Sequence, residues 1–80
     1  MNRQKYKDGT EIHVGHHVFY HGQAGVIVFV ADHDEYTTEY PREEWAYIKT
    51  GFMILLDNGA RLHLDSPDEH FSRNKKESMG

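Results

Sequence analysis

Histidine is the residue type with the widest chemical use in this chain, which has seven histidines and no cysteine among 80 residues. Imidazole is a common ligand of zinc and nickel, but a metal site needs three or four ligands that converge on one ion. If the chain from Ile12 onward is a strand, His17 and His21 lie on the same side about 13 Å apart, too far for one ion. The seven are His13, His16, His17, His21, His33, His63 and His70.

We therefore predict that these histidines lie on strand faces, and that the protein has no metal ligands and no cofactor. Histidine titrates close to neutral pH, so we expect the protein to be sensitive to acid. A histidine-based metal-binding protein is kept as an alternative, because residues distant in sequence can approach one another in the fold.

Two short segments place carboxylates beside imidazole, namely Asp32-His33-Asp34 and Asp68-Glu69-His70. Such pairs could serve as general acid and base, but neighbouring residues in a chain rarely point at one reacting atom. The sequence also lacks a Gly-x-Ser-x-Gly nucleophile motif and a glycine loop that could hold phosphate before a helix. We predict a protein that is not an enzyme and has no catalytic residues.

The segment from Asp32 to Tyr47 interleaves acidic and aromatic residues. Between Asp32 and Glu44 it has six acids and one base. Aromatic anchors and complementary charge dominate the energetics of many protein interfaces. The predicted partner-binding residues are Asp34, Glu35, Tyr36, Glu39, Tyr40, Glu43 and Trp45. The alternative is that Trp45 and Tyr47 pack into the core, since a small domain needs its large aromatics there.

Length and composition limit what can position these residues. Eighty residues allow one small domain, and 38% hydrophobic residues give it a thin core. The net charge of -4 opposes a nonspecific grip on nucleic acid. There is no apolar run of about 20 residues and no secretory signal, so we expect a cytoplasmic protein without a membrane segment.

The pattern from Ile12 to Val30 is typical of two strands, which we expect to turn at Gly22-Gln23-Ala24-Gly25. The runs 52–56 and 61–64 flank Asn58-Gly59, the strongest short hairpin signal. A two-residue turn there would pair Leu55 with Leu62. It would place one apolar patch on one face of the hairpin, made of Met53, Leu55, Leu62 and Leu64.

Two further segments could be helical. Ser66-Pro67-Asp68-Glu69 has the pattern of a capping box, which predicts a single helical or 3₁₀ turn before Phe71 packs back on the sheet. Pro41 to Trp45 could begin a short helix with acids in its first turn, or residues 45–48 could be a strand. We expect an N-terminal arm at residues 1–11, the folded domain at 12–71 and a flexible tail at 72–80.

Several residues resemble the SH3-like small barrels, in particular their KOW and Tudor-like branch. The resemblance covers residues 12–71 and implies an all-β antiparallel barrel of four to five strands with one short helical or 3₁₀ turn. It also implies an alternative function in association with RNA, the ribosome or the transcription machinery. It rests on Val14, Gly15, Val18, Tyr20, Gly22, Gly25, Ile27 and the Asn58-Gly59 hairpin.

In size and charge the chain is also similar to bacterial immunity proteins, which neutralise toxins. We therefore expect a non-enzymatic protein-binding module that occludes a basic partner, such as a toxin or nuclease, through its acidic aromatic loop. The partner would be a protein rather than nucleic acid or a membrane. An exposed strand edge would allow a monomer or a weak dimer.

Overall fold

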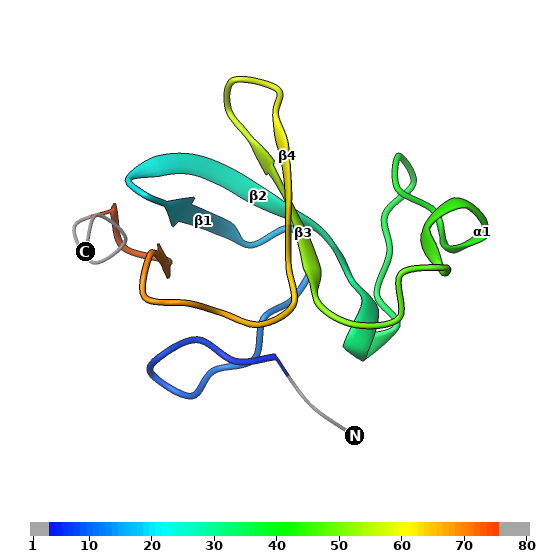
Figure 1. Cartoon of the computed structure of the whole chain (residues 1–80), viewed down its shortest axis with the longest axis horizontal. Coiled ribbons are helices and arrows are strands. Elements are labelled where there is room, and N and C mark those ends of the chain that lie inside the picture. The colour runs from blue at the N-terminus through cyan, green and yellow to red at the C-terminus, as the bar shows by residue number, and fades with distance from the viewer. Residues whose placement is uncertain (1–3, 76–80) are drawn as a thin grey trace.

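The computed structural model describes residues 4–75 and is a single antiparallel sheet of five short strands. The sheet curls into a half-barrel, with the strands in the order β4-β3-β2-β1-β5 (Figure 1). This confirms the predicted all-β class and is compatible with an SH3-like fold. The strands are β1 (His17–Tyr20), β2 (Gln23–Val30), β3 (Phe52–Leu56), β4 (Arg61–Leu64) and β5 (Phe71–Ser72).

Two single helical turns lie in the connection between β2 and β3. They are the 3₁₀ turn η1 (Ala31–His33) and α1 (Arg42–Trp45). The second is the helical alternative predicted after Pro41, whose fixed φ suits the entry to a helix. In Figure 1 the segment with α1 projects at the opposite end of the sheet from β5.

The helical turn predicted at Ser66 was wrong, because an Asp68 turn replaces it. The carboxylate of Asp68 accepts the N–H of His70 at 2.8 Å, and its carbonyl accepts the N–H of Phe71 at 3.2 Å. An aspartate that binds its own backbone two residues on favours a turn over a helix. Phe71 nevertheless packs back on the sheet as expected and is 2% exposed.

The first hairpin turns earlier than predicted. Tyr20 pairs with Gln23, so the loop is His21-Gly22, and both residues have positive φ. This is the two-residue loop whose twist matches that of the flanking strands. Gly25 therefore lies inside β2 rather than in the turn. A Cβ there would lie 2.9 Å from the carbonyl oxygen of Leu55, so glycine permits the close approach of β3.

The register predicted for the second hairpin was wrong by one residue. Ile54 pairs with Leu62, and Leu55 pairs with Arg61. The reason lies in the loop, where the N–H of Leu56 donates to the carbonyl of Ala60 at 2.8 Å. This closes a three-residue loop rather than the two-residue turn that Asn-Gly suggested.

A shift of one residue exchanges the two faces of a strand. Phe52 and Ile54 are therefore fully buried on one face, and Leu62 and Leu64 pack beside them partly buried. Met53 packs on the opposite face, in a second cluster with Phe29. The sheet thus has apolar side chains on both faces, and each face needs a cover.

The segment that precedes the strands covers the first face. Lys5 and Glu11 form an isolated bridge, which folds residues 4–12 into a loop beside the sheet. Tyr6 and Ile12 are 7% and 0% exposed and belong to the larger core cluster. The N-terminal arm therefore contributes to the core instead of extending from it. Residues 76–80 of the predicted tail lie outside the described residues, whereas Ser72 belongs to β5.

Two glycines with nearly the same φ provide a test of the packing at the end of β3. Gly51 has φ 89° and Gly59 has φ 88°, but only at Gly51 would a Cβ clash, lying 2.2 Å from the carbonyl oxygen of Leu64. We expect Gly59→Ala to cost about 1 kcal/mol of unfolding free energy from the left-handed backbone alone. Gly51→Ala should cost about 3 kcal/mol, because the clash adds to that strain. Urea unfolding measures both, and equal losses would contradict the packing described.

Candidate functional site

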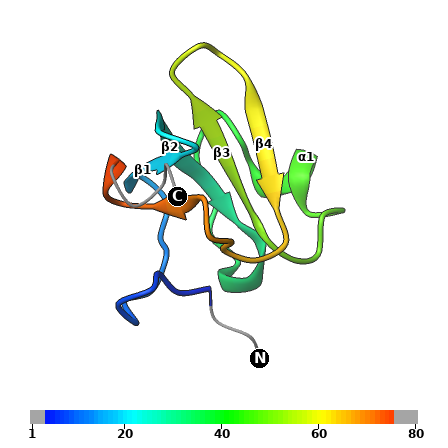
Figure 2. The ribbon, with the colours of Figure 1, turned by 60° about the vertical axis from the view of Figure 1, so that its left-hand side comes forward.

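The segment between β2 and β3 covers the second face of the sheet. Its cluster is built on Val28, Phe29 and Met53, all buried. Figure 2 shows α1 on the far side of the sheet from β5. The side chains that pack against the buried three include Tyr36, Tyr40, Trp45 and Ile48.

The aromatic rings of this segment stack outward from the sheet. Trp45 lies 5.6 Å from the Phe29 ring and 5.5 Å from the Tyr40 ring, and it is partly buried. Tyr47 then stacks on Trp45 at 6.2 Å and is 70% exposed. The two aromatics that could have been core or interface therefore differ: Trp45 is largely a packing residue, and Tyr47 faces solvent.

Asp32 binds the Gln4 side chain and the Gly51 backbone, and the other acids of the segment fall into three groups. Asp34 forms an ion pair with Arg42, and the Arg42 guanidinium also lies 5.9 Å from the centre of the Tyr36 ring. Glu35 turns away toward the N-terminal segment. The exposed remainder, together with Tyr47, is here named the acidic-aromatic surface and consists of Glu39, Glu43, Glu44 and Tyr47.

Glu35 joins a cluster of histidines at the other side of the segment. Its carboxylate accepts the Nδ1–H of His13 at 2.6 Å and the N–H of Val14 at 3.1 Å. The Nδ1 of His33 lies 3.8 Å from the Glu35 carboxylate oxygen that accepts the hydrogen bond of His13. Of the seven predicted partner-binding residues, Glu39 and Glu43 belong to the acidic-aromatic surface, the three aromatics pack toward the sheet, and Glu35 lies among imidazoles.

Around Glu35 lies a network of histidine and tyrosine side chains that the strand pattern in the sequence did not predict. The rings of His13 and His16 are 5.7 Å apart, and the Nδ1 of His16 is hydrogen-bonded to the Tyr6 hydroxyl at 2.9 Å. The strand predicted from Ile12 begins only at His17, and a turn precedes it. This turn brings together histidines that an extended chain would have separated, while His33 arrives from η1, beyond any local pattern.

Charge and burial set the protonation of this network. Burial raises the pKa of Glu35, but hydrogen bonds from His13 and the Val14 amide, with the charges of His13 and His33, outweigh it and leave that pKa lowered. Burial, followed by the charges of Arg73 and His13, lowers the pKa of His16. Glu35 is therefore a carboxylate at neutral pH, hydrogen-bonded on two sides.

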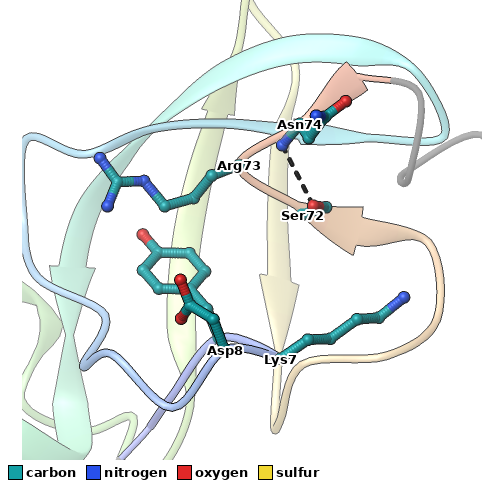
Figure 3. A pocket seen from close by; sticks show the side chains of 6 residues that line it. Lys7, Asp8, Ser72, Arg73 and Asn74 are labelled. Carbon is teal, nitrogen blue, oxygen red and sulfur yellow. Dashed lines mark hydrogen bonds between the residues drawn. The ribbon is translucent and has the colours of Figure 1, made fainter.

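A pocket of about 420 Å³, lined mostly by polar residues, lies between the N-terminal segment and the end of the chain that the structure describes. Figure 3 shows Lys7 and Asp8 on one side of it and Ser72, Arg73 and Asn74 on the other. Tyr6 also lines it, and burial raises the pKa of Tyr6 to about 12. Its phenol therefore stays protonated at neutral pH.

A second histidine pair connects the residue that follows β1 with the residue that precedes β5. The rings of His21 and His70 stack at 3.8 Å, and the N–H of His21 donates to the carbonyl of His70 at 3.1 Å. The Tyr20 hydroxyl donates to the carboxylate of Asp68 at 2.8 Å. These contacts hold the segment before β5 in place, which is a structural role.

Comparison of the chain with models of protein families, with curated proteins and with solved structures finds no match. Among residues 4–75, no helix has the length and apolar character needed to cross a membrane.

The lowered pKa of Glu35 predicts how stability depends on pH. A carboxyl with a lower pKa in the folded than in the unfolded protein stabilises the fold above its unfolded pKa, and this contribution is lost as the pH falls through the folded pKa. Glu35→Gln should therefore be less stable than the wild type at pH 7, and the difference should shrink as the pH falls below about 4.

Urea unfolding at several pH values measures this difference. Glu43→Gln is the matched control, because it removes a carboxylate from the exposed face of the same segment. A deficit of Glu35→Gln that stays constant from neutral to acidic pH would contradict the role given to the ionised carboxylate.

Proposed function

We propose that this protein is a non-enzymatic binding module that engages a basic protein through its acidic-aromatic surface. The observation that carries the proposal is Tyr47, a large aromatic side chain that is 70% exposed and supported from beneath by Trp45. Tyrosine offers a large rigid area with a polar end, and it is among the residues that contribute most to interface energies.

The packing of the residues beneath Tyr47 favours a role of this side chain in binding. Trp45 is fixed between the rings of Phe29 and Tyr40, and the Arg61 guanidinium lies 5.9 Å from its ring centre. A side chain that is already ordered loses little entropy on association. The Tyr47 ring is therefore presented on a rigid base.

The acidic residues of this surface favour a positively charged partner. Glu43 and Glu44 lie on α1, four and three residues before Tyr47, and both are exposed. The net charge of the chain is -4. Surface acids steer the encounter with a basic protein and fix its register, while the aromatic anchor supplies buried area. Binding of this kind would block the partner by occlusion, in the manner of an immunity protein that neutralises a basic toxin or nuclease.

The SH3-like interpretation is compatible with the same surface and does not assign its partner. A KOW or Tudor-like domain would bind RNA or the ribosome through basic residues, whereas the exposed part of this segment is acidic. Binding of nucleic acid is therefore the competing outcome of the test rather than a second proposal.

The test uses capture from cells of the native source, with the full chain as bait and quantified recovery. We expect Tyr47→Ala to reduce recovery of a basic protein at least about tenfold, as for loss of a central aromatic anchor. The combined variant Glu43→Gln/Glu44→Gln should slow association and weaken its dependence on salt. Surface plasmon resonance with the recovered protein measures both rates.

Glu69→Gln is the matched control, because it removes an exposed carboxylate outside the acidic-aromatic surface. The Glu69 side chain is 82% exposed and lies beside His70, in the turn before β5. This variant should recover the partner as well as the wild type does. Recovery that Tyr47→Ala leaves unchanged, or recovery of nucleic acid in place of a protein, would contradict the proposal.

A further inference from the structure

We propose that Glu11, His13 and His33 form a binding site for zinc or a similar divalent transition-metal ion. Each of the three offers one ligand atom, and these atoms all lie within 4.8 Å of one another. The site is independent of the acidic-aromatic surface, because it involves the N-terminal segment and η1 and none of the four residues of that surface.

The spacing of the ligand atoms suits a small ion. Zinc bonds of about 2.0–2.1 Å in a tetrahedral site put neighbouring ligand atoms about 3.3 Å apart. The Nε2 of His13 and a carboxylate oxygen of Glu11 are separated by 3.7 Å. Inward movements of about 1 Å would bring all three ligands to zinc. Two of them belong to partly exposed side chains, which can move this far.

His33 provides the second, independent observation. Its side chain is 0% exposed, and its Nδ1 is buried without a hydrogen-bond partner. Leaving a buried polar atom unpaired is costly, so such atoms call for an explanation. The Nδ1 of His33 lies 3.8 Å from the carboxylate of Glu35. The ring centre of His13, which contacts the same carboxylate, is 5.7 Å from that of His33. A metal ion would give this nitrogen its missing partner.

Glu35 prepares His13 for ligation. Because a carboxylate can only accept, the 2.6 Å contact requires the proton of His13 to lie on Nδ1. The free electron pair is then on Nε2, the nitrogen nearest Glu11. A carboxylate that orients a ligating histidine in this way is a recurrent feature of zinc sites. Glu35 is therefore a positioning residue rather than a ligand.

Ligation by His33 requires one rearrangement. Its Nε2 accepts the backbone N–H of Gln4 at 2.9 Å, so in the metal-free protein the ring proton lies on Nδ1. An ion at Nδ1 displaces this proton, and a neutral ring then carries its proton on Nε2, where it faces the Gln4 amide. The bond to Gln4 must therefore break, and metal binding is coupled to release of the N-terminal segment at that point.

Two imidazoles and one carboxylate are the donor set of open zinc sites, in which water occupies the fourth position. Nitrogen ligands favour zinc, copper and nickel over magnesium and calcium, which prefer oxygen. Zinc is therefore the probe, and magnesium tests the selectivity.

The experiment titrates zinc chloride into the full chain, prepared without a histidine tag and stripped with a chelator. Isothermal titration calorimetry at neutral pH should show one zinc per chain and no binding of magnesium. Glu11→Gln and His13→Gln should each weaken the affinity at least about tenfold, and Glu35→Gln about 10- to 100-fold. His17→Gln is the matched control, because His17 is an exposed histidine on β1 outside the proposed site, and the affinity of this variant should equal that of the wild type.

A measurement on the wild type avoids variants that fail to fold. Nitrogen-15 NMR of the histidine rings should show the His33 proton on Nδ1 without zinc and on Nε2 with it. The Gln4 amide should exchange faster when zinc is bound. Absence of one-to-one binding, an affinity that Glu11→Gln and His13→Gln leave unchanged, an equal loss in His17→Gln, or a His33 ring that zinc does not alter would each overturn the proposal.

Discussion

A single curled sheet of five short strands has two faces, and apolar side chains on both must be covered by chain from outside the strands. Residues 4–12 cover one face through Tyr6 and Ile12. The segment between β2 and β3 covers the other with its aromatic side chains. Both segments are therefore held against the sheet by the packing of these side chains.

Asp32 connects the two covers. One of its carboxylate oxygens accepts the side-chain amide of Gln4 at 2.5 Å and the backbone N–H of Gly51 at 2.8 Å. It thus joins the N-terminal segment, η1 and the entry to β3 at one point. Because His33 follows Asp32 directly, the same fastening fixes the buried imidazole beside Glu35. Packing of the sheet and geometry of the histidine cluster therefore depend on the same few contacts.

The sequence was sufficient where the signal is local. Strand composition and glycine positions predicted the all-β class, and Pro41 indicated α1 as one of two alternatives. The sequence-based prediction was wrong where two turn types compete, as at Asp57-Asn58-Gly59. A three-residue loop forms there instead of a two-residue turn, and this exchanges the two faces of the strand. The histidine cluster depends on contacts between η1 and the N-terminal segment, which no spacing along one strand encodes. That placement follows from covering the sheet, so it is a tertiary property.

The division of the segment from Asp32 to Tyr47 follows from the same constraint. Trp45 and Tyr36 pack on Phe29, and their commitment to the second face decides which neighbours remain exposed. Tyr47, two residues beyond Trp45, cannot reach the sheet and stacks on the outside of the cover. Glu35 lies where the segment passes the N-terminal residues, so its carboxylate is drawn into the histidines. The aromatic and the imidazole surfaces are thus two consequences of how one thin sheet is covered.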